Sequence, residues 1–220
     1  MDLKKHFNKV DFERLVLVPV FFSLLLINAL GAYSHLEKHL FSDAVSTFHI
    51  VHKGLMICFY ILLIALFFTR SEAKATSRSL LARTLAYAGT FTPFLLSFTK
   101  GPNTGITTTL ISISIMTCGM LFCLYSLKTL GRSFGIMPQA RSLVRRGPYR
   151  LIRHPLYVGE IVAFGGAILT GFTITKLGIF LLLIALQSYR AFQGEKVLEE
   201  TIPAYSVYKS ATKRFIPGVI

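Results

Sequence analysis

The chain has 220 residues, of which 53% are hydrophobic and only 15% carry a charge, whereas a soluble domain usually carries about 25% charged residues. This composition, with a mean hydropathy of +0.58, excludes an ordinary soluble protein and predicts a single integral membrane domain over residues 1–220. We assign the net charge of +14 to contact with anionic lipid headgroups, and we expect no nucleic-acid partner.

Uncharged segments predict an all-α membrane bundle of about six spans. Residues 1–127 are expected to hold four of them, in runs that lie at 15–33, between Lys53 and Arg70, between Arg83 and Lys100, and at 101–127. The runs 161–175 and 177–189 are short, and they become the fifth and sixth spans if 157–160 begins one helix and the other continues past Arg190. Gly171-Phe172-Thr173 would then turn a tight helical hairpin.

The distribution of Lys and Arg predicts the orientation of these spans. With the N-terminus in the cytoplasm, the non-cytoplasmic side keeps only four of the 24 basic residues, which are Lys38, Lys53, Lys100 and Lys176. Both termini are then cytoplasmic, as are the loop 128–153 and the tail 190–220. The tail contains Tyr205 and Tyr208, and it fits equally a helical membrane anchor and a lid over a pocket.

The polar loop before the fifth span combines several groups that bind ligands. Pro155 is suited to the first position of a helix, whose free N–H groups would face the loop beside Arg150, Arg153 and His154. An anionic group, such as the carboxylate of an amino-acid-like cofactor, would be stabilised there. Tyr149 and Tyr157 offer flat faces for a purine or ribose. A basic loop that contacts phospholipid headgroups is an equally good interpretation.

Three blocks in the last part of the chain resemble the isoprenylcysteine carboxyl methyltransferase family, which is also similar to phospholipid N-methyltransferases. They are Leu130-Gly131-Arg132-Ser133-Phe134, the segment 143–159 with its Arg-His-Pro-x-Tyr-x-Gly core, and a tail that ends in Arg214-Phe215-Ile216-Pro217-Gly218. The resemblance implies a membrane methyltransferase that uses S-adenosylmethionine, bound between the Arg-His-Pro loop and the tail. Residues 128–220 would then hold the catalytic loop, the hairpin and the tail.

The family pattern also implies roles for single residues. The residues expected at the cofactor are Leu143, Val144, Gly147, Tyr149, His154, Pro155 and Tyr157. Arg190 and Glu195 would meet the methyl acceptor. The chain departs from the pattern in two places, because Gly194 replaces the usual first acid and Arg141 replaces a common histidine. These departures bear on the acceptor more than on the cofactor.

The acceptor is expected to be lipidic or amphipathic. A carboxylate is the acceptor group most consistent with the resemblance, and it needs no general base. The alternative is a phospholipid amine, which must lose a proton, and Glu195 is then the nearest base in the sequence. Glu160, one turn into the fifth helix, is interpreted as part of a buried ion pair with an Arg or Lys of the loop or tail. The sequence leaves the oligomeric state open.

A non-catalytic membrane haem or metal protein remains a rival interpretation. The spacing of His35 and His39, and of His49 and His52, is compatible with shared metal ligation on a helix. Interfacial histidines near helix ends explain the same spacing, and no metal site is expected. The three cysteines lie in apolar runs and are interpreted as small hydrophobic residues. A plain lipid-binding scaffold is a third interpretation.

Overall fold

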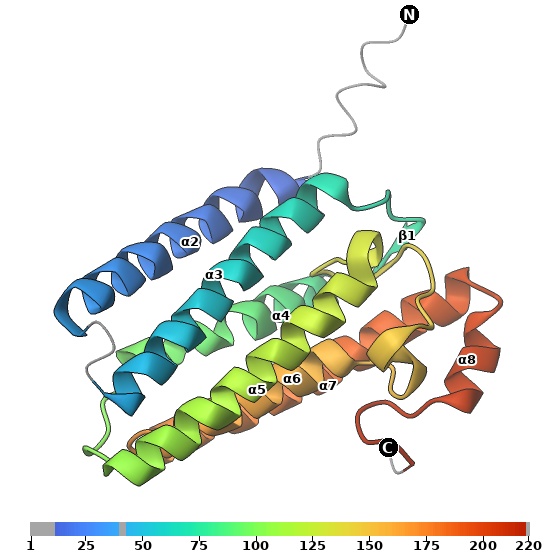
Figure 1. Ribbon diagram of the computed structural model, residues 1–220. Helices are drawn as coiled ribbons and strands as arrows, with labels where there is room; N and C mark the ends of the chain where they lie inside the picture. The colour runs from blue at the N-terminus through green and yellow to red at the C-terminus, as the bar shows by residue number, and fades with distance from the viewer. Residues whose placement is uncertain (1–11, 40–42, 219–220) are drawn as a thin grey trace, which may run out of the picture.

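The computed structural model describes residues 12–39 and 43–218, and it is almost entirely helical (Figure 1). The α-helices are α2 (Phe12–His39), α3 (Ala44–Thr69), α4 (Leu80–Phe91), α5 (Ile106–Leu130), α6 (Pro155–Leu169), α7 (Ile174–Thr201) and α8 (Tyr205–Ala211). Short 3-10 helices lie at Thr92–Phe98, Gly131–Ser133 and Gly147–Arg150. Two short strands, β1 (Ala75–Thr76) and β2 (Gln139–Ala140), pair antiparallel.

Four helical segments within the described residues are long and apolar enough to cross a membrane, so the chain is a multi-pass membrane protein. They are Glu13–Glu37, Ala44–Thr69, Ile106–Ser133 and Ile174–Thr201. The predicted count of six spans is not confirmed. The third predicted span is α4 followed by a 3-10 helix, because Pro93 lacks the N–H that would continue the α-helix. The fifth, α6, has only 15 residues.

The boundaries of α3 and α7 show why counting between charges was misleading. Asp43 caps α3 by accepting a hydrogen bond from the amide of Ser46 at 2.8 Å, so that helix starts well before Lys53. Lys176 lies inside the first turn of α7 and donates to the carbonyl of Thr170, just after α6 ends. A long Lys side chain can thus lie within a span when its ammonium group reaches a polar partner at the helix end.

Helices α5 and α6 pack backbone to backbone. A Cβ added to Gly119 would lie 2.4 Å from the amide nitrogen of Ala163, and one added to Gly159 would lie 2.9 Å from that of Cys123. Small residues permit such close packing of membrane helices. The hydroxyl of Ser112 also donates to the carbonyl of Gly166 at 2.7 Å. Since α6 packs mainly on α5 and less on α7, a tight α6–α7 hairpin is not confirmed, although residues 170–173 do join the two helices.

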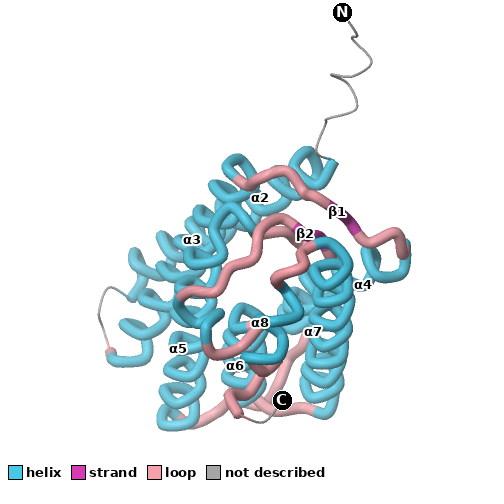
Figure 2. The backbone as a smooth tube through the Cα atoms, turned by 90° about the vertical axis from the view of Figure 1, so that its right-hand side faces the viewer, coloured by secondary structure: helices cyan, strands magenta, loops and turns pink. Residues whose placement is uncertain are grey.

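The loops after α3 and α5 are fixed to each other at one end of the bundle. Ala75 pairs with Ala140 in the β1–β2 ribbon, and the buried carboxylate of Glu13 binds both Arg70, at 2.7 Å, and the amide of Met137, at 3.1 Å. Figure 2 views the molecule from this end, where the ribbon, the loops and α8 gather. The polar segments therefore form one layer over the ends of the long helices.

Candidate functional site

A cavity of about 520 Å³ runs from the layer of loops into the helical bundle. Its outer end is polar and is lined by Tyr149, Arg153, His154, Tyr205 and Tyr208. Its inner end is apolar and is lined by side chains of α3, α5 and α6, among them Phe59, Leu63, Met120 and Phe164. The cavity thus joins a site for a polar ligand to a site for an apolar one.

Helix α6 runs along the length of this cavity. His154 at its N-cap, then Tyr157, Glu160, Phe164 and Ala167, line the cavity at intervals of three or four residues, so they occupy one face of the helix. The series changes from polar to apolar as it enters the bundle. The helical repeat of α6 therefore sets the order in which a ligand would meet these groups.

The Arg-His-Pro loop and the C-terminal tail are bound directly to each other, as expected if they close one site. Ile152 and Lys213 form a parallel bridge, and the amides of Arg153 and His154 donate to the carbonyls of Lys213 at 2.8 Å and Arg214 at 3.1 Å. These contacts continue to α8 and hold the tail against the polar end of the cavity.

We call the contacts between the Arg-His-Pro loop and the tail the seam. The buried phenol of Tyr208 in α8 adds a contact to it by donating to the carbonyl of Tyr149 at 2.6 Å. Burial raises the pKa of Tyr208 to about 12 and that of Tyr149 well above its ordinary value. Both phenols are therefore protonated at neutral pH, and that of Tyr208 acts as a hydrogen-bond donor.

Glu195 of α7 joins the loop to the tail electrostatically. Its Oε1 accepts hydrogen bonds from Arg153 Nε at 3.0 Å, His154 Nε2 at 3.0 Å and Arg214 Nε at 2.9 Å. Its Oε2 accepts another from Arg214 Nη2 at 2.9 Å, which makes that pair bidentate. The carboxylate is only 3% exposed and is surrounded by donors, so its place is structural.

Burial favours the neutral form of His154, and the hydrogen bond to Glu195 fixes its tautomer. Burial lowers the pKa of His154 below its ordinary value of 6.5, although the hydrogen bond to Glu195 acts in the opposite direction. Because a carboxylate only accepts, His154 Nε2 carries the proton and Nδ1 is left as an acceptor. The ring stacks on Tyr157 with 5.3 Å between centroids and an interplanar angle of 6°.

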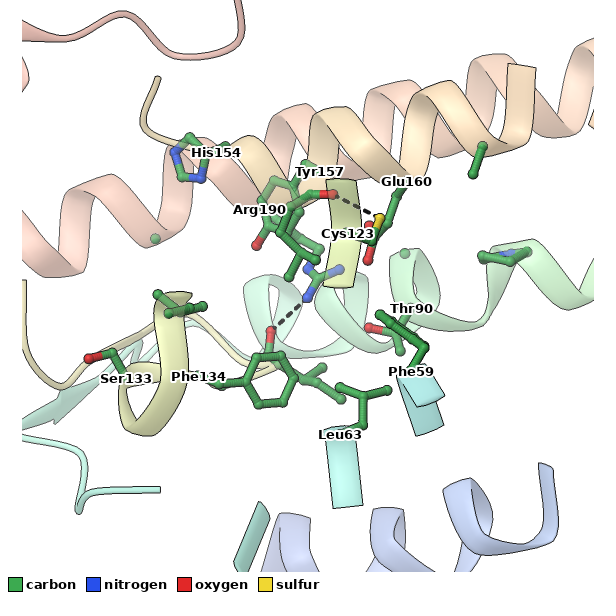
Figure 3. Close-up of a pocket in the computed structure, with 18 of the residues that line it drawn as sticks. Phe59, Leu63, Thr90, Cys123, Ser133, Phe134, His154, Tyr157, Glu160 and Arg190 are labelled. Carbon is green, nitrogen blue, oxygen red and sulfur yellow. Dashed lines mark hydrogen bonds between the residues drawn. The ribbon is translucent and has the colours of Figure 1, made fainter. Parts of the chain in front are cut away.

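Deeper in the bundle, Glu160 of α6 and Arg190 of α7 line the cavity and are connected through Gln187, which is not among the lining residues. Gln187 donates from Nε2 to Glu160 Oε2 and accepts at Oε1 from Arg190 Nη1 at 3.0 Å. Arg190 also donates from Nη2 to the carbonyl of Ile136 at 3.1 Å, and its guanidinium lies 5.0 Å from the centre of the Tyr157 ring. Figure 3 shows Tyr157, Glu160 and Arg190 on one side of the cavity, opposite Phe59 and Leu63.

Two comparisons with known proteins bear on the site, and the first of them covers α5, α6 and α7. Residues 104–202, from just before α5 to the end of α7, match the profile of the phospholipid methyltransferase family, PEMT. The nickel-cobalt-cadmium resistance protein NccN of Alcaligenes xylosoxydans xylosoxydans is 32% identical over 114 residues. Those residues are 50% of this chain and 53% of that protein, so the similarity spans about half the length of the curated relative.

The structure brings most of the predicted site residues to the cavity. Those that line it are Leu143, Val144, Tyr149, His154, Tyr157 and Arg190. Gly147, Pro155 and Glu195 are not among its lining residues. Gly147 adopts a positive φ of 55° beside Thr129, a conformation that favours glycine, and Pro155 is fully buried at the start of α6.

Other site residues were missed or interpreted differently from the sequence. Gln187 was missed, although an amide within the apolar run 177–189 was a usable signal. Glu160 does not pair with the loop or tail, since its hydrogen bond comes from Gln187. Gly194, in place of the usual first acid, lines the cavity, and so does Arg141, which donates to Ser71 and Gln139.

The polar end of the cavity fits a polar cofactor. The hydroxyl of Tyr205, at this end, and the Nε of Arg190, deeper in the cavity, are buried and have no hydrogen-bond partner among the described residues, and both side chains line the cavity. A buried donor without a partner destabilises the protein unless a ligand or water satisfies it. S-adenosylmethionine, with its carboxylate, ribose and adenine, offers acceptors of the kind that these atoms need.

The histidines near the C-terminal end of α2 and the N-terminal end of α3 do not form a metal cluster within the described residues. The rings of His35 and His49 lie 5.9 Å apart, and His52 lines the cavity. The side chain of His39 lies outside the described residues. No group of three or more His, Cys, Asp or Glu able to hold a metal ion occurs in the part of the chain that the structure describes.

Proposed function

We propose that this protein is a membrane methyltransferase that transfers the methyl group of S-adenosylmethionine to a lipidic or amphipathic acceptor. The observation that carries the proposal is the single cavity with a polar outer end and an apolar inner end. The methyl donor is polar and would suit the outer end, whereas a lipid acceptor is largely apolar and would suit the inner end. The match of residues 104–202 to phospholipid methyltransferases supports the proposal, since α6 and α7 lie within that region.

The cofactor would occupy the polar end, between the Arg-His-Pro loop and the tail. Tyr149, Tyr205 and Tyr208 supply flat rings there, and Tyr205 supplies a free hydroxyl. His154 and Tyr157, stacked on each other, form a further flat surface. The bound cofactor supplies an electrophilic methyl group on a sulfonium. The residues of this chain contribute by holding donor and acceptor in line, because methyl transfer is a direct displacement.

The acceptor would enter the apolar end, where Phe59, Leu63, Met120 and Phe164 provide a hydrocarbon-like lining. Its reactive group would then lie near Tyr157, Glu160 and Arg190, where the two ends of the cavity meet. The family resemblance favours a carboxylate acceptor, and a phospholipid amine is the alternative. We further propose that the termini and the polar layer face the cytoplasm, as the distribution of Lys and Arg predicts.

The decisive experiment measures binding of S-adenosylhomocysteine, the demethylated cofactor, to the detergent-purified protein by calorimetry. We expect saturable binding to the wild type and weaker binding, by roughly 2- to 10-fold, to Tyr205→Phe. The Tyr205 hydroxyl has no partner among the described residues, so its removal should not lower the stability of the ligand-free protein. Tyr33→Phe changes an exposed tyrosine and is the matched control. Absence of binding to the wild type would overturn the proposal.

A second experiment tests the class of acceptor. The purified protein is supplied with S-adenosylmethionine carrying a labelled methyl group and with a panel of soluble and lipid-like acceptors. We expect label only in molecules with a long hydrocarbon chain, since the inner end of the cavity is apolar. Methylation restricted to soluble molecules would contradict the proposed lipidic substrate.

A further inference from the structure

Glu160 is the only acidic residue among those lining the cavity, within the part of the chain that the structure describes. It lies one turn beyond Tyr157 on α6, between the polar and apolar ends. A carboxylate is costly to hold in a largely apolar cavity, so its retention there calls for a role. Among the described residues its hydrogen bond comes from Gln187, and that bond occupies Oε2.

Glu195, the base expected from the sequence, has a different environment. Four hydrogen bonds from Arg153, His154 and Arg214 converge on its two oxygens, and it does not line the cavity. A carboxylate stabilised by several cationic donors is a weak proton acceptor. Glu195 therefore holds the seam, and proton transfer within the cavity falls to another group.

We propose that Glu160, and not Glu195, binds the ammonium group of an amine-bearing methyl acceptor and takes up its proton. This inference rests on the proposed methyltransferase function with its alternative acceptor, the phospholipid amine. An amine is protonated at neutral pH and has no lone pair for attack until a base removes a proton. Glu160 supplies that base at the junction where an acceptor headgroup would meet the methyl donor.

The charge of Glu160 itself agrees with an amine. A carboxylate headgroup beside Glu160 would be repelled by it, whereas an ammonium group would be attracted to it. Arg190 has only its Nε left for an anion, because its Nη1 and Nη2 already donate to Gln187 and to the Ile136 carbonyl. Gln187 binds both Glu160 and Arg190 and thereby fixes their positions, and its bond to Oε2 leaves Glu160 Oε1 for the acceptor.

The proposed step balances. The acceptor ammonium gives one proton to Glu160, and the nitrogen lone pair then forms a bond to the methyl carbon. The bond between that carbon and the sulfonium sulfur breaks, and its electron pair stays on sulfur as a neutral thioether. The product leaves as a methylated ammonium ion, and Glu160 returns its proton to water.

The first test needs no methyl donor. Binding of dodecylamine and of dodecanoic acid to the purified protein is measured by calorimetry in a neutral detergent. We expect the wild type to bind the amine about tenfold or more tightly than the acid, and Glu160→Gln to lose this preference, because it removes a charge-assisted hydrogen bond. Glu199→Gln, which alters an exposed carboxylate paired with Lys209, should keep the preference. An unchanged preference in Glu160→Gln would overturn the inference.

The second test uses methylation and separates this inference from the proposed function. Glu160→Gln should lower kcat for an amine lipid about 100-fold or more while S-adenosylhomocysteine still binds, and Glu160→Asp should restore part of the rate. If the cofactor binds but only carboxylate lipids are methylated, the role of Glu160 is overturned and the methyltransferase function stands. If the wild type does not bind the cofactor, the proposed function fails and this inference fails with it.

Discussion

Two carboxylates on neighbouring helices, Glu195 of α7 and Glu160 of α6, have opposite surroundings. Glu195 lies among Arg153, His154 and Arg214 and is excluded from the cavity, whereas Glu160 lines the cavity and has Gln187 as its hydrogen-bond donor. The first joins segments of the chain that are distant in sequence, and the second faces the space where a ligand would bind. The number of donors around a buried carboxylate therefore separates a structural role from a chemical one in this protein.

The largest effect is expected from Glu195→Ala, which removes the centre of the seam. It leaves the partly buried guanidinium of Arg153 and that of Arg214 without their carboxylate, which we expect to cost about 3–5 kcal/mol of stability. The tail should then become sensitive to trypsin at Lys209 and Lys213, as measured by limited proteolysis in detergent. In the control Glu199→Ala, the lost pair is exposed and the cost should stay within about 1 kcal/mol. Equal proteolysis of both variants would contradict a seam held by Glu195.

A smaller effect is expected from Tyr208→Phe, which tests the neutral part of the same seam. The change leaves the buried carbonyl of Tyr149 without its 2.6 Å hydrogen bond and should cost about 1–3 kcal/mol in unfolding experiments. Burial raises the pKa of Tyr208 to about 12, so this loss should be constant between pH 6 and 9. The exposed Tyr33→Phe is the control. A loss that varied over this range would assign the stabilisation to charge.

The third prediction concerns pH and is smaller, since one group changes charge. Burial lowers the pKa of His154 below 6.5, so the unfolded chain takes up a proton more readily than the folded protein. The stability that this group contributes is complete above pH 6.5 and is lost as the pH falls toward the folded-state pKa. The charged groups that face the ring are Glu195, Arg153 and Arg214.

Thermal midpoints in detergent at pH 7.5, 6.5 and 5.5 measure this effect. The wild type should lose stability between pH 6.5 and 5.5, and His154→Asn, which cannot take up a proton, should lose less. The difference between the two proteins removes contributions from the other histidines. Identical slopes would show that His154 does not titrate with folding.

The sequence was sufficient for the helical class and for the contact between the Arg-His-Pro loop and the tail. Long apolar runs predict membrane helices because a helix satisfies its own backbone hydrogen bonds inside the bilayer. The polar loop and the tail were predicted to lie on the same side of the membrane, where they can contact each other. It did not predict that Pro93 would divide the third span or that α3 would begin at Ala44, because charges alone were used as boundaries. Capping by Asp43 was the local signal that would have corrected α3.

The roles of Glu160 and Glu195 could not be assigned from the sequence. Glu160 finds its donor 27 residues away on α7, and Glu195 finds His154 41 residues away on the loop. Both pairings depend on how α6 and α7 are rotated. Glycine contacts with α5 constrain α6, and the close approach of Gly89 in α4 to Leu186 and Arg190 constrains α7. The family pattern pointed to the loop and tail around the cavity, but the partners that distinguish the two acids are a property of the packing.

The smallest effect is expected from Gly194→Ala, and it tests whether the gap left by the missing acid is empty. A Cβ at Gly194 would have no atom within 4 Å, so the change should stabilise α7 by about 0.5–1 kcal/mol through the better helix propensity of alanine. Gly159→Ala has the same intrinsic gain but would place its Cβ 2.7 Å from the sulfur of Cys123, so it should destabilise. Thermal midpoints of the two variants should therefore move in opposite directions. A lower thermal midpoint for Gly194→Ala would contradict the open space that the structure shows beside Gly194. The replacement of the usual acid by glycine would then provide no extra space for an acceptor.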